Sequence, residues 1–285
     1  MKTALSKMFL FMVALFFPIF AYASSAALFV SPSSIIQGEP AEITVQNAAL
    51  SQVKSISFNG EKLGVFLYQN IPTAFVGVDI HQKSGTYPIT ATLTSGTILQ
   101  TNLVVGQRPN IQTAFDIPQT LGGDSTSSAE TLVSTLAEEN DELLGLYTGT
   151  HAFWTNPFKF PLSQITITDP YGYLRDTDGS SIIHKGTDFR AAIGTPVMAM
   201  NRGVVRLTKY FRDYGNTIIV DHGLGLMTFY MHLSKINVNV GELVQQGQII
   251  GLSGNTGDAV GPHLHITVRI NDISIDPMKF MAFFK

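Results

Sequence analysis

The sequence predicts a mainly β protein in which a helical linker separates two strand-rich regions. Three observations support this fold class. Residues 27–105 contain short segments in which apolar and polar residues alternate, the pattern of half-buried strands. Residues 127–146 carry apolar residues at helical spacing. From His151 onward the chain is first aromatic and then again rich in strand-forming residues, so the second region is expected to be β as well.

The first residues have the order of a secretory signal. Lys2 and Lys7 precede an apolar run over residues 8–21, which ends in the small-residue pattern Ala-Tyr-Ala. A retained membrane anchor is the alternative interpretation, but the run is shorter than the about 20 residues that span a bilayer, and it contains Pro18. We therefore expect residues 1–23 to be a signal peptide that is removed on export, leaving no membrane span.

Composition narrows the chemistry of the exported chain. The sequence has no cysteine, which excludes disulfides, a thiolate metal site and a cysteine nucleophile. The formal net charge of −3 becomes −5 without residues 1–23, because that segment carries two lysines and no acidic residue. Nucleic acid is not an expected partner, since its binding relies on basic surfaces. The remaining length suits two domains at about 150 residues per domain.

The first strand-rich region is expected to be a small antiparallel β-sandwich. It contains about seven strand-like segments, separated by glycine or Asn-Gly turns. The segment Gly85–Thr90 resembles the late hairpin of bacterial immunoglobulin-like modules. We therefore predict an immunoglobulin-like domain over residues 24–105. Its single histidine, His81, is expected to lie in a surface loop, so this domain offers no chemistry.

Residues 106–150 are expected to form a linker with one helix. The spacing of Ser127 and Glu130 is that of a capping box at a helix start, and leucines recur at helical spacing behind it. We expect the helix to pack against the C-terminal domain or to bridge the two domains. Consecutive acids on a helix usually form a solvated face rather than a metal site, which is the expectation for Glu138, Glu139, Asp141 and Glu142.

The candidate chemistry lies in residues 151–285, above all in a His-x-His pair. Successive side chains alternate faces on a strand, so His263 and His265 point to one side while Leu264 points to the other. Two imidazoles on one face suit a shared metal, or one ligand with an acid–base group beside it. A pair of surface histidines on an edge strand is the alternative interpretation.

A second candidate pair lies upstream. On one straight strand His184 and Asp188 would share a face about 13 Å apart, too far for one metal ion. Gly186 between them allows the backbone to bend, so that both side chains reach one point. With one histidine of the later pair they form a set of two nitrogens and one oxygen, which leaves a fourth position for water. His232 is a further candidate for proton transfer, whereas His222, before a turn, is expected to be structural.

Together these residues resemble the signature of the lysostaphin-type (LytM-like) zinc endopeptidases, which cut peptidoglycan cross-bridges. The resemblance extends over residues 151–285 and includes the segments Gly194–Val197, Val220–Gly223 and Gly254–Gly257. It implies an antiparallel β-sheet metallopeptidase domain. It also implies three Zn²⁺ ligands and two catalytic histidines that do not bind the metal: His184, Asp188 and His265 as ligands, and His232 and His263 as the catalytic pair.

The activity implied by the resemblance is zinc-dependent hydrolysis of peptide bonds in peptidoglycan stem peptides or cross-bridges. Metal-activated water attacks, and the two catalytic histidines move protons; which of them is the base stays open. The signal favours a periplasmic protein of cell-wall remodelling over a protein released from the cell. The alternative function is a catalytically silent regulator that activates other cell-wall hydrolases. Regulators of that kind have lost the metal ligands, whereas all five chemical positions are intact in this sequence.

The N-terminal region is expected to restrain the activity. A sandwich and an aromatic linker precede the peptidase domain and are placed to cover its cleft. We therefore expect contact of the N-terminal domain or the linker with the active-site cleft, and partial latency of the full-length mature chain.

Overall fold

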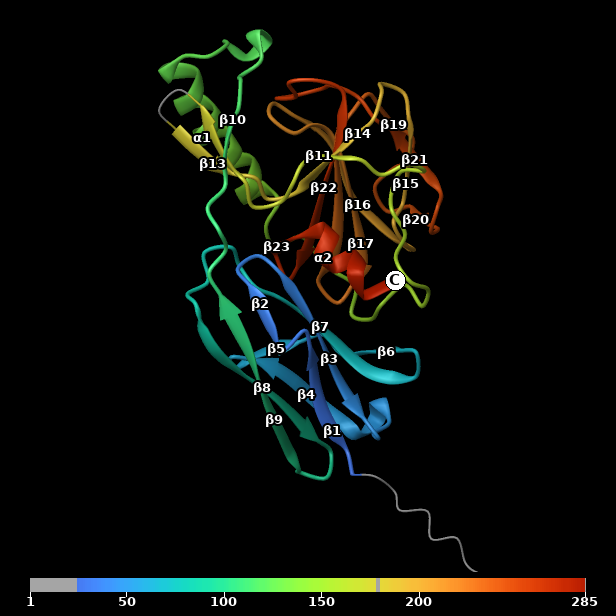
Figure 1. Ribbon diagram of the computed structural model, residues 1–285. Helices are drawn as coiled ribbons and strands as arrows, with labels where there is room; N and C mark the ends of the chain where they lie inside the picture. Colours follow the sequence, from blue (N-terminus) through green and yellow to red (C-terminus); the bar gives the residue numbers. More distant parts are fainter. Residues whose placement is uncertain (1–24, 178–179, 285) are drawn as a thin grey trace, which may run out of the picture.

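The computed structural model describes residues 25–177 and 180–284 (Figure 1). The predicted signal peptide, residues 1–23, lies outside the described residues. Within the described part, strands form five sheets and dominate the structure, which confirms the mainly β fold class. None of the helices in these ranges is long and apolar enough to cross a membrane.

Two sheets packed face to face form the N-terminal part of the structure (Figure 1). One has the strand order β1-β3-β7-β6 and the other the order β2-β9-β8-β4-β5. Their alternating residues meet in a shared core, where Ile43 of one sheet and Ile56 and Ile89 of the other are fully buried. The elements are β1 (Ala27–Ser31), β2 (Ser34–Ile36), β3 (Pro40–Gln46), η1 (Leu50–Gln52), β4 (Val53–Phe58), β5 (Glu61–Leu63), β6 (Phe66–Tyr68), β7 (Ile71–Gly77), β8 (Gly85–Leu93) and β9 (Ile98–Gly106).

This sandwich differs from the expectation in two respects. The described chain forms nine strands here rather than about seven, and three of them, β2, β5 and β6, have only three residues each. In addition, β2 runs parallel to β9, whereas every other pairing in the two sheets is antiparallel. The immunoglobulin-like character of residues 24–105 stays a prediction.

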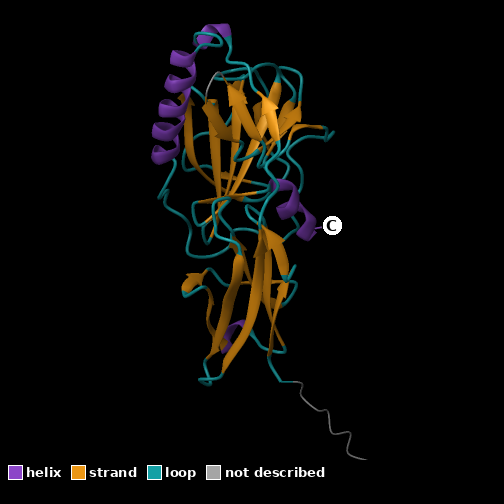
Figure 2. Ribbon diagram, turned by 60° about the vertical axis from the view of Figure 1, so that its left-hand side comes forward, coloured by secondary structure: helices purple, strands orange, loops and turns teal. Residues whose placement is uncertain are grey.

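The linker adds a strand and a helix to the side of the C-terminal region. After β10 (Gln112–Ala114) and η2 (Gln119–Leu121), α1 (Thr126–Glu142) runs along that region (Figure 2). The capping prediction was wrong by two residues: Ser125 is the N-cap and accepts a hydrogen bond from the backbone N–H of Ser128 at 3.2 Å. The helix packs through the buried Leu132 against Ile182. β10 pairs with β12 (Leu174–Thr177), which pairs in turn with β13 (Ser180–Ile183).

An eight-stranded sheet with only antiparallel pairings forms the centre of the C-terminal region. Its order is β11-β14-β22-β18-β17-β16-β20, with β23 paired to β22. All eight residues of β18 are buried, which explains a continuous apolar run rather than an alternating one. The elements are β11 (Ile167–Asp169), β14 (Thr187–Arg190), β16 (Gly203–Phe211), β17 (Gly215–Gly223), β18 (Leu226–Leu233), β20 (Leu243–Val244), β22 (His263–Ile270) and β23 (Ile273–Ile275). A smaller sheet contains β15 (Pro196–Met198), β21 (Ile249–Leu252) and β19 (Lys235–Ile236), and the chain ends in α2 (Pro277–Met281) and η3 (Ala282–Phe284).

An aromatic cluster joins the sandwich to the C-terminal region. Phe75 of β7 stacks on Trp154 with ring centroids 6.2 Å apart, and meets Phe280 of α2 edge-on at 5.8 Å. These side chains belong to the same apolar core as the large sheet. An ion pair between Glu39 and Lys279, at 3.0 Å, lies across the same junction. The sandwich is therefore packed against the C-terminal region rather than tethered by the linker alone.

Candidate metal centre

Three adjacent segments of the large sheet bring the candidate residues together. β14 and β22 pair with Asp188 opposite His265, and β18 pairs with the other side of β22, with Met231 opposite His265. His184, three residues before β14, and His232, which follows Met231 in β18, therefore reach the same place as the His-x-His pair. All five residues expected from the sequence meet there: His184, Asp188, His232, His263 and His265.

Three of these side chains are arranged to hold one cation. Nε2 of His184, Oδ1 of Asp188 and Nδ1 of His265 lie 2.8 to 3.3 Å from one another. Zinc bound tetrahedrally at about 2.0–2.1 Å holds its ligand atoms roughly 3.3 Å apart, so the spacing fits a single ion. All three residues are buried, with 6% or less of their surface exposed. Buried polar groups that converge in this way could hold a metal ion.

The partners behind the two imidazoles fix which nitrogen faces the centre. His184 donates its Nδ1–H to the carbonyl of Pro170 at 3.0 Å, which leaves Nε2 as a lone pair. His265 donates its Nε2–H to the hydroxyl of Thr267 at 2.9 Å, and that hydroxyl donates to the carbonyl of Lys185 at 3.2 Å. Nδ1 of His265 is therefore the acceptor. Such outer hydrogen bonds orient the imidazoles of metal sites and raise their basicity.

Gly186 is required for a reason that the sequence did not reveal. The predicted break in the strand is present, since β13 ends at Ile183 and β14 begins at Thr187. Space adds a second requirement: a Cβ on Gly186 would lie 2.2 Å from Nε2 of His265 and 2.7 Å from the carbonyl oxygen of Ile266. Glycine therefore lets the backbone pass directly behind the imidazole of His265.

The two remaining histidines lie beside the donor set with one nitrogen each held by the backbone. His232 donates its Nδ1–H to the carbonyl of Thr256, and His263 donates its Nδ1–H to the carbonyl of Gly261, both at 2.8 Å. Nε2 is then the free nitrogen on each ring, and that of His263 lies 3.7 Å from Oδ1 of Asp188. His232 has a φ of 59°, in the left-handed region that residues other than glycine rarely adopt. Strain of this kind is common at functional sites.

Burial sets the protonation of the cluster. It lowers the pKa of His232 well below the ordinary value, an effect that His263 and His265 strengthen. Burial also lowers the pKa of His265 to about 4, although Asp188 opposes this. Burial alone would raise the pKa of Asp188, but His184 and His265 hold it well below the ordinary value. At neutral pH Asp188 is therefore a carboxylate, and His232 and His265 are neutral imidazoles, the forms that bind a cation and accept a proton.

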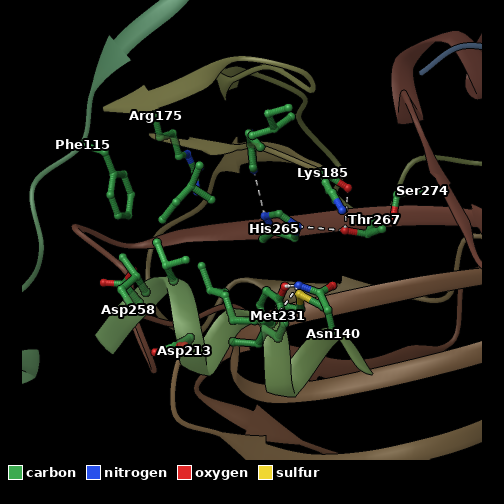
Figure 3. Close-up of a pocket in the computed structure, with 18 of the residues that line it drawn as sticks. Phe115, Asn140, Arg175, Lys185, Asp213, Met231, Asp258, His265, Thr267 and Ser274 are labelled. Carbon is green, nitrogen blue, oxygen red and sulfur yellow. Dashed lines mark hydrogen bonds between the residues drawn. The ribbon is translucent and has the colours of Figure 1, made fainter. Parts of the chain in front are cut away.

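The cluster opens into two adjoining cavities of about 350 and 430 Å³. The first lies between α1, which contributes Asn140, and the large sheet, which contributes Met231 and His265 (Figure 3). Leu132 and Leu136 of α1 also line it. The second is bounded by Thr168 and the loop before His263. The two cavities meet at four residues that line both of them: Phe115, Arg175, His232 and Asp258. The linker thus contributes directly to the walls of the cleft.

Two side chains near the site were not anticipated. Glu139 was expected on a solvated face, and that prediction was wrong: it is 8% exposed and accepts hydrogen bonds from the backbone N–H groups of Asp213 and Tyr214 at 3.0 and 3.2 Å. The helix turns this carboxylate toward the turn between β16 and β17, and helical spacing alone gives no sign of that. Arg175 reaches Asp188 from β12, and no motif in the sequence connects the two.

Comparison with known proteins agrees with this geometry. Residues 182–277 match the model of peptidase family M23. The C-terminal region is a peptidase M23 domain. This confirms the family resemblance of the sequence. The domain is 48% identical over 96 residues to the peptidoglycan DD-endopeptidase ShyA of Vibrio cholerae, a match that covers 34% of this chain and 22% of ShyA. The peptidoglycan DD-endopeptidase ShyC of the same organism is 40% identical over 104 residues, or 36% of this chain and 24% of ShyC.

The chain matches about a quarter of the length of these two relatives or less. A solved structure resembles more of the chain. The crystal structure of a peptidase M23 from Pseudomonas aeruginosa covers 88% of this chain and 96% of its own, with a TM-score of 0.57 and 24% identity. The fold that this chain shares with that protein therefore extends beyond residues 182–277.

Proposed function

We propose that the chain is a zinc-dependent endopeptidase that hydrolyses peptide bonds in peptidoglycan stem peptides or cross-bridges. The convergence of His184, Asp188 and His265 on one point, with two further histidines beside them, carries the proposal. The substrate class is supported by the M23 relatives named as peptidoglycan DD-endopeptidases. A catalytically silent regulator is not favoured, because the residues that the chemistry requires are all present and assembled.

In this proposal His184, Asp188 and His265 hold the zinc ion. Two neutral imidazoles and one carboxylate are a ligand set of catalytic zinc sites, which leaves room for water. Zinc bound there would activate a water molecule as the nucleophile and polarise the carbonyl of the scissile bond. The outer hydrogen bonds to Pro170 and Thr267 keep both imidazoles turned toward the ion.

His232 and His263 move protons in this proposal. Their rings are held by backbone carbonyls rather than by flexible side chains. Nε2 of His263 lies 3.7 Å from Oδ1 of Asp188, and the ring centroid of His232 lies 5.9 Å from that of His265. One ring takes a proton from the attacking water, and the other donates to the developing oxyanion or to the leaving amine.

We further propose export to the periplasm and the domain division 24–105, 106–150 and 151–285. The signal-like order of residues 1–23 supports the first, and so does the cell-wall substrate named for the relatives. The second is supported by the separate sheets of the sandwich and of the M23 domain.

Partial latency through the linker is also part of the proposal. Phe115 lines both cavities, and α1 forms one wall of the first cavity. α1 is fastened to the M23 domain by Glu139 and by a hydrogen bond from Thr135 to Asp213. A peptide that must lie across both cavities therefore meets the linker, and access requires it to move.

The proposed function is tested with cross-linked muropeptides. We expect the mature chain, residues 24–285, to cleave a peptide bond in them, to lose this activity after chelation and to regain it on addition of Zn²⁺. Activity that survives complete removal of metal would overturn the proposal.

A further inference from the structure

We propose that Arg175 is a positioning residue for Asp188: it holds one oxygen of the carboxylate, so that the other alone faces the cation. This inference rests on the metal site of the proposed function. Arg175 lies upstream of residue 182, where the match to the M23 family begins.

The two oxygens of Asp188 have different partners. Oδ1 lies 2.8 Å from Nδ1 of His265 and 3.3 Å from Nε2 of His184, inside the donor set. Oδ2 accepts a charge-assisted hydrogen bond from Nη2 of Arg175 at 2.5 Å. Charge-assisted hydrogen bonds are among the strongest in proteins, so this contact resists rotation of the carboxylate. Asp188 is thereby fixed to offer a single oxygen.

Arg175 is itself held on several sides. Its Nε donates to Oδ2 of Asp169 at 2.7 Å, and its guanidinium lies over the ring of Phe115, 4.8 Å from the centroid. Its backbone belongs to β12, paired to Ile182 on one side and to Thr113 on the other. The side chain is 16% exposed. Figure 3 shows the labelled Arg175 and Phe115 side by side. A guanidinium placed in this way acts as a preorganised clamp rather than a mobile surface charge.

The consequence for the cation follows from carboxylate geometry. Without the guanidinium, both oxygens of Asp188 can turn toward the ion, which changes its coordination number and takes up space needed for water. Loss of such an outer partner typically weakens metal affinity about 10–100-fold. Lysine is a point charge without the fork of arginine, so it can restrain Asp188 or pair with Asp169 but does not reproduce both contacts.

The chain contains a matched control. Arg206 donates through Nε and Nη2 to Asp221 at 3.0 and 2.8 Å, and it lies 4.9 Å from the ring centroid of Tyr147. Like Arg175 it pairs with a carboxylate and lies over an aromatic ring, but Asp221 lies outside the group of side chains that could hold the metal, and Arg175 contacts a second carboxylate, that of Asp169. Replacement of Arg206 measures what the loss of such a clamp does to folding alone.

The experiment compares Arg175→Ala, Arg175→Lys and Arg206→Ala in the mature chain. Zn²⁺ affinity is measured by competition with a chromophoric chelator, the metal geometry by the absorption spectrum of bound Co²⁺, and folding by the melting temperature of the metal-free protein. We expect Arg175→Ala to weaken Zn²⁺ binding about 10–100-fold and to change the Co²⁺ spectrum. Arg175→Lys should recover part of the affinity, and Arg206→Ala should leave both metal readouts at the wild-type values whatever it does to melting.

Two results would overturn the inference. One is a Zn²⁺ affinity and a Co²⁺ spectrum in Arg175→Ala that equal those of the wild type. If Arg175→Ala does not fold, the same result in Arg175→Lys would overturn it. The other is an equal loss of affinity in Arg206→Ala, which would make the effect one of stability. Failure of the proposed function gives a different result. A wild-type chain that binds Zn²⁺ but cleaves nothing contradicts the proposed activity and leaves the role of Arg175 testable. A wild-type chain that binds no metal contradicts both the proposed function and the role of Arg175.

Discussion

The imidazole rings of His232 and His263 face one another with their centroids 4.7 Å apart. Each ring is oriented by a backbone carbonyl, that of Thr256 for His232 and that of Gly261 for His263. Because both acceptors belong to the main chain, the direction of the free nitrogens is set by the fold of the loops around the site. The pair is therefore organised before any substrate arrives.

Two substitutions of His232 distinguish the chemical role of its side chain from the cost of its left-handed backbone. Both His232→Ala and His232→Gly should lower kcat by about 10²–10⁴, since each removes an acid–base group. The glycine variant should nevertheless be the more stable of the two by about 1 kcal/mol, because alanine alone pays for the left-handed φ of 59°. Denaturant unfolding of the metal-free proteins checks this; an alanine variant as stable as the glycine variant would contradict the assigned strain.

The close passage at Gly186 predicts a steric effect on the metal site. Gly186→Ala should lower the unfolding free energy by about 1–3 kcal/mol and weaken Zn²⁺ binding, because the new Cβ displaces the imidazole of His265. Gly85→Ala is the control, since its Cβ would meet nothing closer than Tyr87 at 3.9 Å, and its stability should stay within about 0.5 kcal/mol of the wild type. Equal effects of the two substitutions on Zn²⁺ affinity would count against the assignment.

His222 should make stability depend on pH. Its ring lies between the carbonyl of Arg202 and the hydroxyl of Thr228, and burial lowers its pKa to about 4. The unfolded chain takes up a proton on this residue below about pH 6.5, whereas the folded chain does not until about pH 4. The stabilisation is therefore complete above pH 6.5 and is lost as the pH falls toward 4.

The matching measurement compares wild type and His222→Gln, so that the other titrating groups cancel. The difference in their unfolding free energies should shrink by about 3 kcal/mol between pH 7 and pH 4. A difference that does not change with pH would show that the buried histidine is not the titrating group.

Release of α1 should raise activity if the linker restrains the enzyme. Hydrogen bonds to a charged group contribute about 1.5–3 kcal/mol, so loss of the Glu139 carboxylate should favour the open cleft by about 10- to 150-fold. We expect Glu139→Ala to cleave cross-linked muropeptides faster than the wild type. Glu138→Ala is the control, since the neighbouring Glu138 is exposed. Equal rates for the two variants would refute latency through this contact.

Local patterns in the sequence predicted much of the site. Strand alternation correctly put His263 and His265 on one face, because β22 is a regular strand throughout. The break between His184 and Asp188 was also expected. What local patterns do not encode is contact between distant segments. The position of Arg175 over Asp188 depends on how the hairpin of β12 and β13 folds back on β14, and no spacing rule describes that.

The same limit explains the errors in the rest of the fold. Phe75 and Trp154 lie far apart in the chain, so the aromatic cluster that joins the sandwich to the M23 domain was not anticipated. Glu139 was assigned to a solvated face because consecutive acids on a helix usually form one, and that rule does not describe the turn that the helix packs against. β5 and β6 have three residues each and lie close together in the chain, and segments this short show too little periodicity to be told apart.

The most direct test of the proposed enzyme measures zinc content and muropeptide cleavage side by side for the mature chain, His184→Ala and His263→Ala. The proposal predicts one zinc per chain and cleavage in the wild type, weakened zinc binding in His184→Ala, and an inactive His263→Ala that retains its zinc. Full zinc content without cleavage in the wild type would contradict the enzyme and favour a regulator, and a wild type without zinc would contradict the metal site itself.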